Sequence, residues 1–75
     1  MSDKDKFNEL LLIGLRTIWG VNLNNLADFH ELDEKFHHRI NEYCQNGQGK
    51  VEKNYFILTE NGMHFADGIA QELFI

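Results

Sequence analysis

One segment of this 75-residue chain has the pattern of β structure, and it is short enough to limit the possible folds. Turn-forming residues at 45–50 lead into Val51, and the run Tyr55–Leu58 is apolar and rich in strand-forming side chains. Lys53 and Asn54 lie between them and are predicted to form the tip of a hairpin. Because so small a sheet covers only one side of a core, helices must supply most of the packing.

A helical pattern opens the chain. Apolar residues recur at i, i+3, i+4, i+7 and i+8 and predict a helix over Asp5–Arg16. Asp3 or Asp5 near its start would bind free amide groups and interact favourably with the helix dipole. Leu12 and Ile13 widen the apolar stripe, so we expect this helix to be buried on more than one side.

Two further helices are predicted before the hairpin. Residues 17–21 mix β-branched and aromatic side chains with a glycine, which predicts a turn or a short extended piece. Asn22 can cap a short helix over 23–29. The third helix has Asp33–Glu34 at its positive end and Asn46–Gly47 as its stop. Its apolar stripe consists of Leu32, Phe36, Ile40, Tyr43 and Cys44.

The chain closes with a helix that Thr59 is expected to cap. Its predicted buried face consists of Gly62, Phe65, Ala66, Ile69, Ala70 and Leu73. The order is therefore three helices, a β-hairpin and a C-terminal helix. Residues 1–75 are predicted to form a single small α+β domain with a winged-helix-like arrangement.

Charge and composition argue against several classes of function. Seven Lys and Arg against twelve Asp and Glu give a net charge of −5, which disfavours nucleic acid as a partner. The apolar run Leu10–Leu15 is far shorter than the ~20 residues that cross a bilayer. No signal-peptide pattern is visible at 1–8, so we expect no membrane partner and a cytoplasmic location. One cysteine alone can form neither an internal disulfide nor a cluster site.

Histidines are the obvious candidates for metal ligands. His30, Glu34 and His37 have spacings of four and three, which would place them on one face of a continuous helix. A break is predicted near Glu31, however, and a solvated polar face is the commoner cause of such spacing. We therefore predict no metal-binding residues.

Catalytic residues are not predicted either. His64 is expected to take part in a surface charge pair with Glu60 or Asp67. Cys44 falls on the apolar stripe of the third helix, where a structural thiol is commoner than a nucleophile. The only serine is Ser2, and the glycines match no phosphate-binding or dinucleotide motif, so no cofactor-binding residues are predicted.

The end of the first helix carries the best candidates for a contact with a substrate or another domain, namely Arg16, Thr17 and Trp19. A guanidinium group there could bind a carboxylate in a planar fork, and an indole could pack against a flat ring. A structural role is the commoner alternative, in which Arg16 caps the helix and Trp19 fills the core.

Five segments, taken in order, resemble the C-terminal domain of the oxygen-independent coproporphyrinogen III oxidases, which are radical SAM proteins. They are Leu12–Thr17, Gly20–Leu23, Gly49–Glu52, Leu58–Gly62 and Phe65–Ala70. The resemblance covers nearly the whole chain, including "GLRT" with its following "GV" and the "LTENG" that starts the last helix. Single pieces are weak signals, but the ordered set is moderately specific.

The resemblance implies a longer parent protein whose partial barrel holds an iron–sulfur cluster on a Cys-x3-Cys-x2-Cys motif and cleaves S-adenosylmethionine. That parent would decarboxylate propionate groups of coproporphyrinogen III or, in a related branch, bind haem and deliver it to other proteins. This chain would be its accessory domain, packed on the radical SAM barrel and helping to shape the tetrapyrrole site. No activity is expected from the fragment alone.

Two alternatives stand beside this interpretation. The order of elements fits a winged-helix DNA-binding module, although the third helix mixes acidic and basic residues. The chain could also be a protein-interaction domain with an apolar patch for a barrel or another subunit. Leu12, Ile13, Phe74 and Ile75 are the expected patch residues, and this version requires that they are not all buried.

Overall fold

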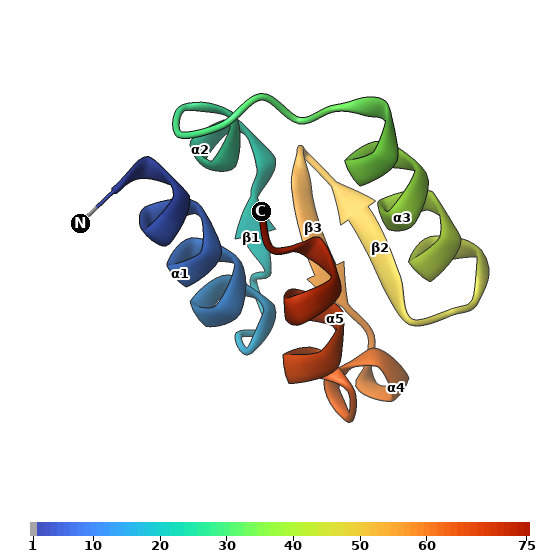
Figure 1. Cartoon of the computed structure of the whole chain (residues 1–75). Coiled ribbons are helices and arrows are strands. Elements are labelled where there is room, and N and C mark those ends of the chain that lie inside the picture. The colour runs from blue at the N-terminus through green and yellow to red at the C-terminus, as the bar shows by residue number, and fades with distance from the viewer. Residues whose placement is uncertain (1) are drawn as a thin grey trace.

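The computed structural model describes residues 2–75, so Met1 of the predicted domain lies outside the described part. The chain contains helices along its whole length, with a short strand after the first helix and a hairpin of two strands after the third (Figure 1). In chain order the elements are α1 (Asp3–Leu15), β1 (Val21–Asn22), α2 (Leu23–Ala27), α3 (Glu34–Gln45), β2 (Gly49–Glu52), β3 (Tyr55–Leu58), α4 (Glu60–Met63) and α5 (Ala66–Leu73). This is the α+β, winged-helix-like order that the sequence predicts.

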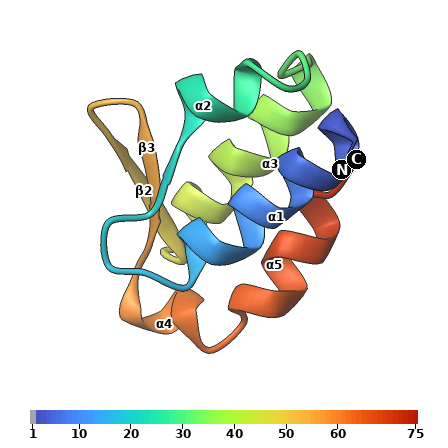
Figure 2. The same ribbon diagram turned by 90° about the vertical axis from the view of Figure 1, so that its left-hand side faces the viewer.

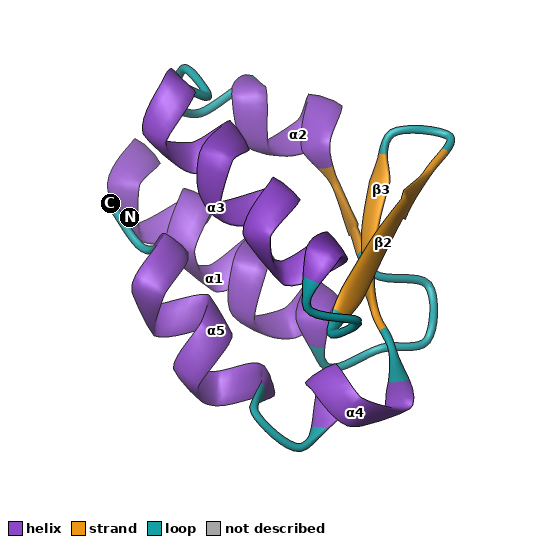
Figure 3. Ribbon diagram, turned by 90° about the vertical axis from the view of Figure 1, so that its right-hand side faces the viewer, coloured by secondary structure: helices purple, strands orange, loops and turns teal. Residues whose placement is uncertain are grey.

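The fold has two layers, because α1, α3 and α5 pack together on one side of a small sheet (Figures 2 and 3). The sheet is antiparallel with the order β1-β3-β2, so β3 is the central strand. Phe56 in β3 is paired with Val21 on one side and Val51 on the other. The side chain of Phe56 is fully buried and joins the sheet to the helical core.

Apolar side chains from every helix and strand except β2 and α4 form the buried core. The largest fully buried ones are Phe7, Phe56, Leu11, Leu15 and Leu26. Phe7 packs edge-on against Phe36 of α3, with ring centroids 6.0 Å apart. Of the predicted stripe of α3, Phe36 and Ile40 are buried and Tyr43 and Cys44 are half-buried, whereas Leu32 lies before the start of the helix.

Helix starts follow local capping chemistry. The side chains of Asn22 and Thr59 accept hydrogen bonds from backbone N–H groups of α2 and α4, as predicted. Asp33, which was predicted only to favour the positive end of the third helix, also caps α3 in this way. The start of α1 differs from the prediction: Ser2 is the cap, and the helix begins at Asp3. Ser2 Oγ accepts a hydrogen bond from the Asp5 N–H over 3.2 Å, so neither predicted aspartate is the cap residue.

The predicted hairpin is confirmed. Strands β2 and β3 pair in register with Glu52 opposite Tyr55, and Lys53 and Asn54 form the tip. Their φ angles of 49° and 66° are positive, as a two-residue turn between twisted strands requires. The first strand is longer than predicted because pairing begins at Gly49.

A third strand was not predicted. Val21 and Asn22 pair with Phe56 and Tyr55, so the expected turn or extended piece also contains an edge strand. A two-residue strand has no periodicity of its own to recognise. Its partner lies more than thirty residues further along the chain, and only the folded structure brings the two together.

The predicted closing helix is broken in two. Helix α4 ends at Met63, α5 begins at Ala66, and Phe65 between them is 56% exposed instead of buried. Gly62 in α4 lies so close to the carbonyl oxygen of Gln48 that a Cβ atom would overlap it. This contact fixes α4 against the start of β2, and α5 turns away to pack along α1.

The expectation that α1 is buried on more than one side was wrong for Ile13, which is 55% exposed. Leu12 is half-buried. The fully buried face of α1 consists of Phe7, Leu11 and Leu15. Within residues 2–75, none of the helices has the length and apolar character needed to cross a membrane.

Candidate interaction surface

The turn between α1 and β1 is held by its own hydrogen bonds. Arg16 ends α1. Its N–H donates to the Ile13 carbonyl over 3.3 Å, and the Thr17 N–H donates to the Gly14 carbonyl over 3.1 Å. Thr17 Oγ1 donates to the Gly14 carbonyl over 2.9 Å and accepts from the Gly20 N–H over 3.2 Å. The Thr17 side chain therefore joins the end of the helix to the start of the strand. Its role in this chain is to fix the turn.

Close packing fixes the same turn from the inside. A Cβ atom on Gly14 would lie 2.7 Å from the Val21 Cβ, so the backbone of α1 packs directly against the side chain of Val21 in β1 at this point. Gly20 has a φ of 78°, and a side chain there would overlap the carbonyl oxygen of Phe56. Both glycines belong to the "GLRT…GV" segment. Their small size lets the turn lie directly on the central strand.

The Arg16 side chain connects this turn to the far end of the sequence. Its Nε and Nη2 donate to Oδ1 of Asp67 over 3.1 and 2.7 Å, which links the end of α1 to the first turn of α5. His64 was expected to pair with Glu60 or Asp67, but the partner of Asp67 is Arg16. Arg16 is thus the C-cap residue that the structural alternative predicted, with its guanidinium group already bound to a carboxylate.

Two large apolar side chains stand out from this braced turn. Ile18 is 75% exposed and Trp19 is 70% exposed. The prediction that Trp19 fills the core was therefore wrong. Ile18 was not among the candidate residues, because its residue type and position gave no signal to distinguish it from the buried Val21. Adjacent exposed side chains of this size on a fixed turn are typical of contact sites for another surface.

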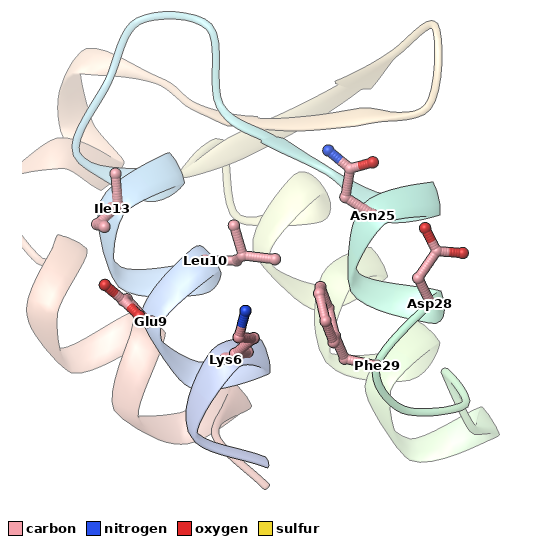
Figure 4. A pocket seen from close by; sticks show the side chains of 7 residues that line it. All are labelled: Lys6, Glu9, Leu10, Ile13, Asn25, Asp28 and Phe29. Atoms are coloured by element: carbon pink, nitrogen blue, oxygen red, sulfur yellow. The ribbon is translucent and has the colours of Figure 1, made fainter. Parts of the chain in front are cut away.

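A groove lies beside the turn, between α1 and α2 (Figure 4). Its volume is about 480 Å³. Leu10 and Ile13 of α1 and Phe29, which follows α2, supply its apolar surface, and Leu10 and Phe29 point toward one another across it. Lys6 lies at one end, with its Nζ 5.9 Å from the centre of the Phe29 ring. The polar lining residues are Glu9, Asn25 and Asp28.

The four residues predicted for an apolar patch do not form one patch. Ile13 lies in the α1/α2 groove, whereas Phe74 and Ile75 border a different hollow beside α3 and α5. The Asn8 side chain binds Ile75 twice, donating to its carbonyl oxygen over 3.2 Å and accepting from its N–H over 2.9 Å. None of the four residues is fully buried, as that prediction requires.

The histidines are dispersed. His30 lies in the loop before α3, whereas His37 and Glu34 belong to α3 itself. His38 Nε2 is 2.7 Å from Glu42 on the next turn of the same helix. In the described part of the chain, no three His, Cys, Asp or Glu residues are grouped closely enough to hold a metal ion.

Two other titratable groups are affected by their surroundings. Burial raises the pKa of the Cys44 thiol above its ordinary value, which makes it less reactive as a nucleophile. Burial, together with a hydrogen bond from its hydroxyl to Glu72, raises the pKa of Tyr43. Arg39 lies 3.7 Å from the same Glu72 carboxylate, so these three side chains link α3 to α5.

Comparison of the chain with family models, with curated proteins and with solved structures finds no match.

Proposed function

We propose that this chain is the non-catalytic accessory domain of a protein of the oxygen-independent coproporphyrinogen III oxidase family, which acts in porphyrin and haem biosynthesis. The domain packs on the radical SAM barrel of its own parent chain and helps to close the tetrapyrrole site. The parent, and not this chain, supplies the iron–sulfur cluster and the S-adenosylmethionine site.

The ordered resemblance carries this proposal, and the positions of the resembling segments support it. Arg16 of "GLRT" binds Asp67 of "FADGIA", which is 51 residues away. Gly14 of the first segment touches Val21 of the second. Segments that are distant in the chain thus cooperate to build one turn. We take this arrangement as support for a common function of the segments, as opposed to a chance resemblance of each segment.

The same geometry assigns different roles to the three candidate residues. Arg16 and Thr17 position the turn, because their polar groups are bound within the domain. Trp19, with Ile18 beside it, is the contact residue, since most of its surface is exposed. Large aromatic side chains are frequent anchors of protein interfaces because they bury much area at a low cost in side-chain entropy.

The proposal can be tested in the full-length parent. Trp19→Ser with Ile18→Ser should increase protease cleavage between barrel and domain and weaken tetrapyrrole binding. Val51→Ser is the matched control, because Val51 is a 46% exposed apolar residue on the hairpin, away from the turn. Wild-type cleavage, tetrapyrrole binding and turnover in the double variant, with the fold intact by circular dichroism, would contradict the docking role.

The parent gene gives an independent test of the family. A Cys-x3-Cys-x2-Cys motif is expected upstream of this segment, and its absence would remove the enzyme assignment. The two branches of the family then separate by activity. Decarboxylation of coproporphyrinogen III indicates the oxidase branch, whereas stable haem binding with transfer to an acceptor protein indicates the haem-chaperone branch.

The winged-helix-like arrangement favours a second candidate, a DNA-binding module in which α3 would contact the bases. The charged side chains of α3 and of the hairpin do not favour this function. Arg39 lies near Glu72, His38 near Glu42 and, on the hairpin, Lys50 near Glu52 at 3.4 Å. Arg39 and Lys50 thus each have a carboxylate beside them that competes with phosphate. A gel-shift assay at low salt would favour this candidate if binding were tight and strongly salt-dependent.

A further inference from the structure

The groove between α1 and α2 has properties that the proposed docking of the Ile18–Trp19 turn does not use. Leu10 and Phe29 form its floor, and Ile13 extends the apolar surface toward the turn (Figure 4). Leu10 and Ile13 are three residues apart on one helix, which separates them by about 4.5 Å along its axis. Two apolar side chains on successive turns of a second helix have a similar spacing and would match them.

The walls of the groove carry charge as well. Glu9 stands on the α1 side and Asp28 on the α2 side. Within residues 2–75, neither carboxylate is ion-paired with another side chain. Lys6 is also in the wall, but its ammonium group lies over the face of Phe29. An apolar floor between two unpaired carboxylates is complementary to an apolar stripe between two cations.

We propose that the α1/α2 groove binds an amphipathic helix whose apolar stripe is flanked on both sides by Lys or Arg residues. Apolar side chains of this helix pack on Leu10, Ile13 and Phe29, and its cations face Glu9 and Asp28. The net charge of −5 on the chain favours the approach of such a basic segment at long range. The inference goes beyond the proposed function, because it depends on the groove alone and not on the family or on a tetrapyrrole.

The test uses the 75-residue chain and two synthetic helical peptides of about four turns. Both peptides have the same leucine stripe, flanked by lysines in one and by glutamates in the other. Their binding is followed by the amide signals of the isotope-labelled chain in NMR titrations. The lysine peptide should bind, with its largest shifts at the residues that line the groove, and the glutamate peptide should bind at least about tenfold more weakly.

Variants of the chain make the assignment specific. Glu9→Gln with Asp28→Asn should weaken binding of the lysine peptide about fivefold, a small effect because exposed ion pairs contribute little. Ile13→Ser should weaken it about tenfold through the loss of apolar contact. Glu52→Gln with Glu60→Gln is the matched control, because it removes the same charge from exposed sites on β2 and α4 and should leave binding unchanged.

Four outcomes would overturn the proposal: equal binding of the two peptides, no binding at millimolar peptide, shifts located away from the groove, or groove variants that bind like the control. Analytical ultracentrifugation tests whether a second copy of the chain occupies the groove. If the chain itself forms a dimer that Ile13→Ser abolishes, a second copy fills the groove and the proposal is wrong. Failure here leaves the upstream-motif and turn-variant tests of the proposed function unaffected.

Discussion

The turn after α1 and the turn between β2 and β3 each bring a strand to one edge of β3, but different interactions hold them. The hairpin tip at Lys53 and Asn54 depends on two positive φ angles of adjacent residues. The turn after α1 depends on Asp67, Phe56 and Val21, which bind or pack against it. The first depends mainly on local backbone angles, with one hydrogen bond from the Leu23 N–H to the Asn54 carbonyl, and the second depends on several distant segments of the folded domain.

This difference explains which surfaces the two turns can offer. At the hairpin tip all residues from Val51 to Tyr55 are exposed, and the Asn54 carbonyl accepts one hydrogen bond from the Leu23 N–H of α2 over 2.9 Å. In the turn after α1, the residues on either side of Ile18 and Trp19 are held by other parts of the fold. A rigid base lets an exposed side chain bind a partner without losing much additional backbone freedom. The braced turn is therefore the better contact site.

The largest effect is expected from Gly20→Ala. A side chain at Gly20 adopts an unfavourable positive φ and also overlaps the Phe56 carbonyl, so the free energy of unfolding should fall by about 3 kcal/mol. Urea denaturation followed by circular dichroism would measure it. A wild-type midpoint would mean that the turn is not seated on β3 as described.

Two other glycines serve as controls for this variant. Gly47 has a φ of 77° with open space around it, so Gly47→Ala should show only the backbone strain, about 1 kcal/mol. Gly68 lies within α5, has open space and needs no special backbone angle, so Gly68→Ala should stabilise the helix by about 1 kcal/mol. Equal losses at Gly20 and Gly47 would show that the contact with Phe56 contributes nothing.

The hairpin tip should respond mainly to its local sequence, because its one hydrogen bond from elsewhere, from the Leu23 N–H, goes to the backbone carbonyl of Asn54 and not to a side chain. Lys53→Asn combined with Asn54→Gly places the residues most tolerant of positive φ at both central positions, and should raise the free energy of unfolding by about 1 kcal/mol. Thermal and urea unfolding would both report the gain. Destabilisation by this pair of changes would mean that tertiary contacts also determine this turn.

A smaller effect is expected for the ion pair that links the turn to α5. The side chains of Arg16 and Asp67 are 55% and 65% exposed, so their coupling energy should be about 0.5 kcal/mol. A double-mutant cycle with Arg16→Met and Asp67→Asn measures it, and added salt should reduce it. A coupling of zero at low salt would leave the glycine and threonine contacts as the only brace.

The smallest effect on stability is expected for Trp19→Ala. Because the indole is 70% exposed, the free energy of unfolding should change by less than about 0.5 kcal/mol. The wild-type chain should show the long-wavelength tryptophan fluorescence of a solvated indole. A large loss of stability would place Trp19 in the core and remove it as a contact residue.

Much of the local structure could be predicted because its causes lie within a few residues of one another. Asn22, Asp33 and Thr59 cap helices through hydrogen bonds to N–H groups two or three residues away. The hairpin tip and the Gly47 stop likewise depend on single backbone angles. The stripes of α1 and α3 were predicted from spacing alone, since a helix buries the residues that share a face.

The candidate site was predicted less well. Its position after the first helix stays a prediction, and the structure differs from the sequence-based expectations for the burial of Trp19 and for the pairing of Asp67. Residue type cannot distinguish an exposed Ile18 from a buried Val21, because the direction of each side chain depends on how the turn lies on β3. The groove beside it is formed by residues of both α1 and α2. The spacing of residues within one helix does not give the relative position of two helices, so the groove could not be predicted.

The sequence by itself determined the order of helices and the hairpin, the caps, the acidic net charge and most of the core. These features follow from periodicity and from short-range hydrogen bonds. The tertiary structure decided the third strand, the break before α5, the Arg16–Asp67 link and the exposure of Ile18 and Trp19. Each of these depends on contacts between segments that are distant in the sequence. Such contacts form only when the whole domain is folded.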